Sequence, residues 1–258
     1  MPAVYRQYTE ELREKYGYLA TWLPNIKLKL GDVGILKRDR FEFITSLDDL
    51  GISFKTRDIS EPADYEYISS DGANIEFNAG ANVAGIGTTV GKSSAKASVL
   101  FKRANAVVFV AKGCKTTLIE QHDRLGKQIV ALYQAGKWPK DHVIITELVT
   151  AESATILVSA TAGAKIDFSA TSQIAPLSLS LAEAAAGLQI ASSSGIATQI
   201  LASRQLTPLF RASGVRRSLF AGSSFDTRST GADDNQRGGT ESAVFSDVDY
   251  ADLEEPIV

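Results

Sequence analysis

The chain has 258 residues, of which 44% are hydrophobic and 22% are charged, with a formal net charge of −3. This composition is ordinary for a folded globular protein and excludes a wholly disordered chain. One cysteine and two histidines exclude a disulfide scaffold and a cysteine-built zinc site, so no metal or other cofactor is expected.

The N-terminal part predicts one helix followed by short elements. A helix is predicted over 4–19, where apolar residues recur at helical spacing: Tyr5, Tyr8, Leu12, Tyr16 and Leu19. Strands are predicted at 27–30 and 41–44, a helical turn at 46–51 and a polar loop over 56–71. The first residues lack the apolar centre of a signal peptide, and no run approaches the ~20 apolar residues of a membrane helix. A cytoplasmic starting location is therefore expected.

The centre of the chain alternates with a period of two. From Ala73 to Val83, apolar residues alternate with Asn74, Glu76, Asn78, Gly80 and Asn82. The alternation resumes over 95–102, after a glycine-rich segment, and 106–110 is apolar throughout. A membrane-spanning strand needs ~9–11 residues of this kind, apolar on one face and polar on the other. A half-exposed antiparallel sheet gives the same pattern, so both interpretations stay open.

The second half of the chain predicts more strands than helices. Thr117 and Glu120 form a capping box that predicts a helix over 117–135, with Gly136 as its stop. Ser180 and Glu183 predict a second, short helix. Strands are predicted at 142–150, 155–159, 165–169, 188–190, 196–201 and 209–210. The expected fold is α+β: a twisted mixed, largely antiparallel sheet with peripheral helices, in a single domain over 1–222.

Negative charge is concentrated at the C-terminal end. Residues 223–258 hold nine acidic residues and two arginines, a net charge of −7, whereas residues 1–222 carry +4. The first part of this segment has no apolar periodicity and predicts a flexible linker. Its second part holds the apolar residues Val244, Phe245, Tyr250 and Leu253, which are suited to anchor it. The segment is either a solubilising acidic tail or one that docks on the basic body and masks a surface.

Two motifs that would carry enzyme chemistry do not fit their templates. The segment 87–93 ends in Gly-Lys-Ser like a phosphate loop, but Ile86 stands where the template needs a glycine. Cys114 and His122 would be a thiol and its base, but His122 lies on the apolar stripe of its predicted helix. We therefore expect no enzyme. Because basic residues do not cluster with aromatic ones, we also expect no nucleic-acid partner.

The order of these features resembles the gasdermin family of pore-forming proteins, particularly its short bacterial and fungal members. The resemblance spans about 70–220: the alternating segment 72–90, the apolar strand 104–109, the helix 117–135, the strand ending at 144–146, the second alternating hairpin and the closing segment 207–210. Gasdermins have a twisted mixed sheet with peripheral helices. On release from autoinhibition they oligomerise, and two hairpins refold into the membrane strands of a large pore.

The resemblance implies hairpins at about 73–111 and 153–200, with the helix 4–19 as the lipid-contacting helix. The short segment 223–258 would then serve as an autoinhibitory tail. The membrane-inserting residues would be Ile75, Phe77, Ala79, Ala81, Val83, Val99, Phe101, Ile156, Val158, Ile166 and Phe168. The residues that contact lipid headgroups would be Lys96, Lys102, Arg103, Lys112 and Lys115, because basic side chains attract anionic lipid.

Functions of different classes remain open. The first is a pore-forming cell-death or defence effector that self-oligomerises on anionic membrane lipids. It would move from the cytoplasm to the inner face of the membrane after an activating protease or partner protein releases the tail. The alternative is a soluble binding or scaffold protein with a fixed sheet and no membrane activity. An enzyme of another type would need a deep pocket lined by convergent polar groups.

Overall fold

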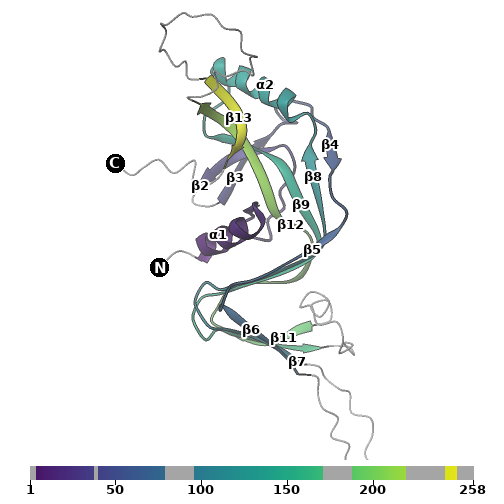
Figure 1. Ribbon diagram of the computed structural model, residues 1–258, viewed down its shortest axis with the longest axis vertical. Coiled ribbons are helices and arrows are strands. Elements are labelled where there is room, and N and C mark those ends of the chain that lie inside the picture. Colours follow the sequence, from purple (N-terminus) through teal and green to yellow (C-terminus); the bar gives the residue numbers. More distant parts are fainter. Residues whose placement is uncertain (1–3, 38–39, 79–95, 171–187, 219–241, 249–258) are drawn as a thin grey trace, which may run out of the picture. The chain divides into compact units, whose positions relative to one another are not determined.

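The computed structural model of the protein describes residues 4–37, 40–78, 96–170, 188–218 and 242–248 (Figure 1). The chain divides into two units whose segments alternate along the sequence. The first consists of Met1–Leu28, Asp58–Thr117 and Leu148–Phe210, and the second of Lys29–Arg57, Leu118–Glu147 and Arg211–Val258. The boundary expected at residue 222 falls between two strands that pair within the second unit.

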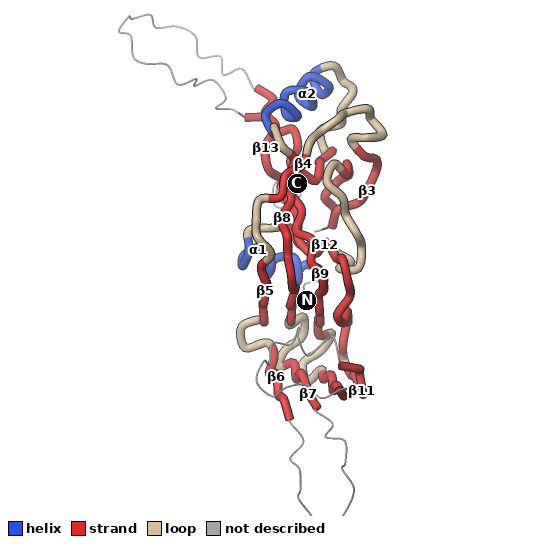
Figure 2. The backbone as a smooth tube through the Cα atoms, turned by 90° about the vertical axis from the view of Figure 1, so that its right-hand side faces the viewer, coloured by secondary structure: helices blue, strands red, loops and turns tan. Residues whose placement is uncertain are grey.

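The described residues form an α+β fold that is mostly antiparallel sheet (Figure 2). The first unit holds α1 (Val4–Tyr16), β1 (Leu19–Ala20), β5 (Ala63–Ile68), β6 (Ala73–Asn78), β7 (Lys96–Phe101), β10 (Lys165–Ala170) and β11 (Leu188–Ser194). The second holds β2 (Asp32–Lys37), β3 (Arg40–Ser46), α2 (His122–Gln134) and β13 (Ser242–Val248). Four strands have residues in both units: β4 (Thr56–Asp58), β8 (Val107–Ile119), β9 (His142–Ser159) and β12 (Ile196–Ser218).

Helix α1 packs on one face of the main sheet of the first unit. Its buried residues Tyr8 and Leu12 lie in a core cluster with Phe109 of β8 and Ile156 of β9. The helix ends where Gly17 takes a positive φ of 70°, and the Gly17 amide donates to the Arg13 carbonyl at 2.8 Å. A glycine in this conformation is a common helix stop because it has no Cβ to clash. The helix predicted over 4–19 is confirmed up to Tyr16, but Leu19 lies in β1 instead.

The second unit has its own core between α2 and strands β2, β9 and β12. Leu125 and Ile129 of α2 are buried with Val33, Ile144 and Val215. Strand β2 pairs antiparallel with β3 on one side and with β9 on the other, and β12 pairs antiparallel with β13. Gly136 has a φ of 69° directly after α2, so the predicted helix stop is confirmed.

The start of α2 was predicted wrongly. The helix begins at His122 rather than at 117, and Gln121 precedes it with a φ of 55° and no capping side chain. Thr117 and Glu120 do not cap it, because β8 continues to Ile119 and the Thr117 hydroxyl donates to Asp58 at 2.6 Å. Pairing within a sheet therefore overrides a local capping signal.

Two further predictions of secondary structure need correction. The segment 56–71 is not a loop throughout, because it contains β4 and β5, and β5 pairs with β8. The segment 27–30 is not a strand. Strand β5 exposes most of its residues, so it carries little apolar alternation by which a sequence would reveal it.

Burial of Cys114 generates a first prediction. The thiol is 1% exposed in the core of the first unit, and burial, with a smaller contribution from the Asp64 charge, raises its pKa to about 12. Because the thiolate is the reactive form, the native protein is expected to react with a thiol reagent at pH 8 at least ~1000-fold more slowly than the unfolded chain.

The matched control places a thiol at the exposed neighbouring position, with Lys115→Cys in a Cys114→Ser chain. This control is expected to react rapidly in the native state. Native Cys114 reacting as fast as Cys at position 115 would contradict the buried environment.

Candidate functional site

Two hairpins lie side by side in the first unit and form a second sheet. Strand β6 pairs with β7, and β10 pairs with β11. The hairpins are joined because β7 also pairs with β10, which gives the strand order β11-β10-β7-β6 (Figures 1 and 2). All three pairs are antiparallel. Residues 79–95 and 171–187, which connect the strands of each hairpin, lie outside the described residues.

The register places residues of one kind in rows across this sheet. One row aligns Ile75, Val99 and Ile166. The next row along the strands aligns Glu76, Ser98, Asp167 and Ser192. Because side chains of neighbouring rows point to opposite faces, the sheet has one apolar and one polar face. The alternation read from the sequence therefore extends across β6, β7 and β10, whereas β11 places Ser193 opposite Ile166.

The apolar face is buried in the folded unit. Val99, Phe101, Ile166 and Phe168 are between 0% and 2% exposed. They form a core cluster with residues of β8 and β9, among them Val108, Val110 and Leu157, and half-buried Ile75 packs against it. Five of the candidate membrane-inserting residues are thus brought together.

The other candidates of that set are placed elsewhere. Ile156 and Val158 belong to β9 and lie fully buried in the cluster beneath α1. Position 77 is in β6, but the Phe77 side chain lies outside the described residues, as do Ala79, Ala81 and Val83.

The candidate headgroup residues differ in what they contact. Lys102 and Lys115 are exposed. Arg103 instead forms a 2.7 Å ion pair with Glu11, and Lys112 forms a 2.7 Å ion pair with Asp64. The Lys112 contact and a bond from the Gly113 amide lower the pKa of Asp64. The Lys96 side chain lies outside the described residues. Two of the five cations are therefore committed to carboxylates in this structure.

Four bends, one at the end of each strand of the hairpin sheet, were not predicted from the sequence. Short segments connect β5 to β6, β7 to β8, β9 to β10 and β11 to β12. Each contains one residue with a positive φ: Asp71 (50°), Asn105 (57°), Gly163 (77°) and Gly195 (65°). Two of the four are not glycines, so the glycine signal alone would not have found the set.

Hydrogen bonds join these bends to one another. The Lys102 amide donates to the Gly72 carbonyl at 2.9 Å, and the Asn105 amide donates to the Ser159 carbonyl at 3.0 Å. The Ala160 amide donates to the Gly195 carbonyl at 2.8 Å. Gly72 approaches its neighbour so closely that an added Cβ would lie 2.9 Å from the Ala106 Cβ. Hydrogen bonds therefore connect the four bends into one layer of the first unit.

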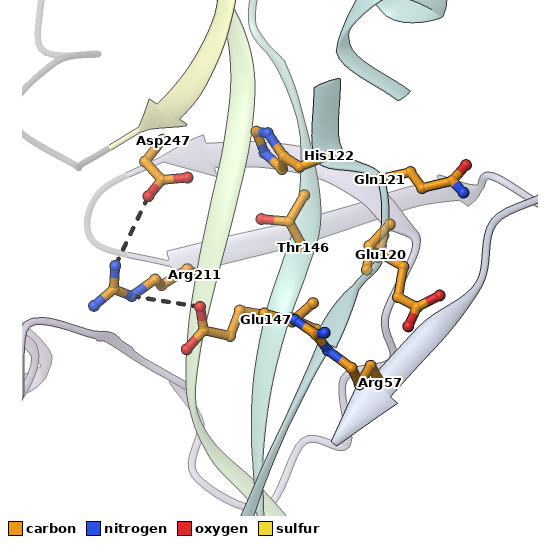
Figure 3. Close-up of a pocket in the computed structure, with 10 residues that line it drawn as sticks. Arg57, Glu120, Gln121, His122, Thr146, Glu147, Arg211 and Asp247 are labelled. Carbon is orange, nitrogen blue, oxygen red and sulfur yellow. Dashed lines mark ion pairs between the residues drawn. The ribbon is translucent and has the colours of Figure 1, made fainter. Parts of the chain in front are cut away.

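A cleft of about 560 Å³ lies in the second unit (Figure 3). Its lining carries charges of both signs, with Arg211 3.9 Å from both Glu147 and Asp247. At its edge Ser213 Oγ donates to Asp247 at 2.9 Å and lies 3.0 Å from both His122 Nε2 and Thr146 Oγ1.

This group is not arranged for serine hydrolysis. A hydroxyl has one proton, and a carboxylate only accepts, so the Ser213 proton is given to Asp247 and none is left for His122 Nε2 to accept. A hydrolase needs the opposite, a histidine that accepts the serine proton while the aspartate holds the histidine. The group instead links β12 to α2 and β13. The second pair considered from the sequence, the Cys114 thiol and the His122 base, is divided between the two units: Cys114 belongs to the first and His122 to the second.

Strand β13 contains two of the four apolar residues that were expected to anchor the acidic segment. Val244 and Phe245 pair with Arg216 and Val215 of β12. The Phe245 ring lies 5.0 Å from the His122 ring, and an added Cβ on Gly126 would approach it to 3.0 Å. The acidic segment thus contains a docked strand. Tyr250 and Leu253 lie outside the described residues.

The described part of the chain has two further properties. Neither of its helices is long and apolar enough to cross a membrane. Within the same residues, no group of three or more His, Cys, Asp or Glu side chains is arranged to hold a metal ion. No protein-family model matches the sequence, and no curated protein matches it.

Docking of β13 generates a second prediction. Phe245→Ala is expected to lower the unfolding free energy of the second unit by about 1–3 kcal/mol, less than for a fully buried Phe because this ring is only half-buried. In a Trp22→Phe background, Trp138 in the core of this unit is the remaining tryptophan and reports its unfolding in urea. Ser246→Ala is the matched control on the other face of the strand. Equal stability of both variants would contradict the packing of Phe245.

Proposed function

We propose that the protein is a pore-forming effector whose two hairpins enter a membrane after self-association. The observation that carries this proposal is the strand order on the two sides of the bends. Before the bends the pairing gives β5-β8-β9-β12, and beyond them it gives β6-β7-β10-β11. The same four chain segments therefore run through both sheets in the same order. Removing the bends would convert two short sheets into one set of long strands without exchanging partners.

The faces on which apolar residues lie also support straightening of the strands across the bends. In a straight strand, residues an even number apart lie on one face. Phe101 in β7 is an even number of residues from Phe109 in β8, and Ile166 in β10 is an even number from Ile156 in β9. Phe109 and Ile156 both face α1, whereas Phe101 and Ile166 face the other cluster. Straightening would thus put the apolar residues of the hairpins on the same face as the residues of the main sheet that face α1, whereas Val108, Val110 and Leu157 would lie on the opposite face.

Such a face suits lipid, and the opposite face suits water. Membrane strands need ~9–11 residues that alternate in this way, and the period-two pattern of the first hairpin reaches from Ala73 to Val83. Leaving the native core costs the burial of Val99, Phe101, Ile166 and Phe168, about 1.5–3 kcal/mol for each. Hydrocarbon would restore that burial, whereas water would not. The exchange therefore avoids this cost only at a membrane.

Control by the acidic segment is part of the proposal. Strand β13 holds the segment 223–258 to the second unit by pairing with β12 and by the Phe245 contact. A protease or partner protein would act on the 219–241 connection or on β13 itself. The protein would move from the cytoplasm to the inner face of an anionic membrane, as expected for the gasdermin-like pattern.

One observation favours the alternative of a binding or scaffold protein with a fixed sheet. Val99, Phe101, Ile166 and Phe168 of the hairpin sheet are between 0% and 2% exposed, so the fold already covers these apolar side chains. The two functions differ in what happens at vesicles. A pore-forming protein releases trapped dye, whereas a fixed sheet does not.

The third prediction tests this difference with the full chain and with a full chain cut at a protease site inserted between 223 and 241. Dye release is measured from vesicles of phosphatidylcholine and phosphatidylglycerol, with phosphatidylcholine alone as the comparison. Release is expected after cleavage and is expected to be stronger from the anionic vesicles. If neither the intact nor the cut chain releases dye from either vesicle, the proposed function is wrong.

The fourth prediction places one charge on either face of the first hairpin. Ala81→Asp puts the charge on the face proposed to contact lipid, where an acidic residue is costly, and dye release is expected to fall at least ~10-fold. Asn82→Asp puts the same charge on the neighbouring, water-facing position and is expected to retain release. Equal release by the two variants would contradict the assignment of faces.

A further inference from the structure

We infer that Glu11 of α1 is a lock that holds the bent form of the first unit. This inference rests on the proposed function, because it names what would restrain the straightening of the four strands. The locking contacts are those of the Glu11 carboxylate with Ser69 and Arg103, which stand in the first and second bends.

The Glu11 carboxylate lies at the contact between α1 and the bends. Residue Glu11 as a whole is 7% exposed, and its carboxylate accepts hydrogen bonds on both oxygens. Arg103 Nη2 donates to Oε1 at 2.7 Å, Gln7 Nε2 donates to the same oxygen at 2.8 Å, and Ser69 Oγ donates to Oε2. Burial and the nearby Glu11 charge raise the pKa of Tyr67 to about 12. A buried carboxylate is tolerable only with partners of this kind.

Ser69 carries the contact from α1 into the second bend. Its hydroxyl gives its proton to Glu11 and accepts the Val107 amide at 2.7 Å. Val107 is the first residue of β8 after the bend. The Ser69 amide in turn donates to the Val107 carbonyl at 2.9 Å. One side chain of α1 therefore fixes the point at which β5 and β8 both leave the main sheet.

Arg103 and Ser159 continue the chain of contacts to the third bend. The Arg103 carbonyl accepts the Ser159 hydroxyl at 2.8 Å, and Ser159 Oγ accepts the Ala106 amide at 2.9 Å. The Arg103 side chain is 39% exposed, whereas the Glu11 side chain is 8% exposed. If the ion pair is lost, Arg103 can still contact water. The second bend then loses its contact with α1.

Helix α1 covers one apolar face of the main sheet, and this position links the Glu11 contacts to exposure of that face. Tyr8 and Leu12 cover the face that holds Phe109 and Ile156, which is the face that would become continuous with the hairpins. Glu11 lies between them in sequence and reaches the bends. Departure of α1 would uncover that face and release Ser69 and Arg103 in one event, so the helix couples exposure of the apolar face to straightening.

Hydrogen exchange of the full chain in solution, without lipid, tests the lock directly. Glu11→Gln keeps the length of the side chain and removes its charge. It is expected to speed exchange of the amides of Gly72, Lys102, Asn105 and Val107 by about tenfold or more, since a hydrogen bond to a charged group is lost. Amides of the second unit are expected to be unchanged. Glu14→Gln, the same change at an exposed position of α1, is the matched control and is expected to have no effect.

A second variant keeps the test decisive if Glu11→Gln loosens the whole unit. Arg103→Gln removes the same ion pair from its more exposed partner and is expected to speed exchange of the same amides. The lock is overturned if both variants leave exchange at the bends unchanged, or if Glu14→Gln speeds it equally.

Dye release from the phosphatidylglycerol vesicles separates this inference from the proposed function. If wild type releases dye, Glu11→Gln is expected to shorten the lag before release. Faster exchange at the bends with no dye release by any form supports the lock and rejects the pore. Dye release by wild type with neither exchange nor lag altered in Glu11→Gln supports the pore and rejects the lock.

Discussion

The bends in four adjacent strands are the constraint on which the account of this protein depends. Amides and carbonyls that would pair along straight strands instead join one bend to the next, as between Lys102 and Gly72 and between Ala160 and Gly195. The bends place the apolar face of the hairpins on the side of β8 and β9 that α1 does not cover. Buried backbone groups must be paired, and the hydrogen bonds between the bends satisfy that need in the bent form.

The arrangement explains how a sheet rich in small and polar residues is accommodated, with one face toward the core and the other toward water. Its polar row of Glu76, Ser98, Asp167 and Ser192 needs water, and its apolar rows need either the core or hydrocarbon. Helix α1 is joined to the bends of the first unit by a few polar contacts centred on Glu11. Strand β13 is joined to the rest of the second unit by a few contacts centred on Phe245. Under the proposed function, few contacts of this kind would be needed to favour the bent form over the straight one.

The sequence predicted the strands of this region better than the way they are joined. Alternation over 73–83, 95–102 and 165–169 correctly predicts β6, β7 and β10, because a half-buried strand leaves a period-two record. The bends leave no such record, since Asp71 and Asn105 take a positive φ that the tertiary structure imposes. The capping box at Thr117 is a local signal that the pairing of β8 overrides. Glu11 belongs to a pattern of alternating charges on α1, and only the fold shows which of them is buried.

The central claim is that the strands straighten across their bends at a membrane, and a distance within β7 and β8 tests it most directly. Spin labels at Leu100 and Lys115, both exposed in the first unit, lie on either side of the second bend in a Cys114→Ser chain. Straightening predicts that their separation rises to ~50 Å on vesicles, at ~3.3 Å per residue. An unchanged separation on vesicles from which the protein releases dye would contradict the account.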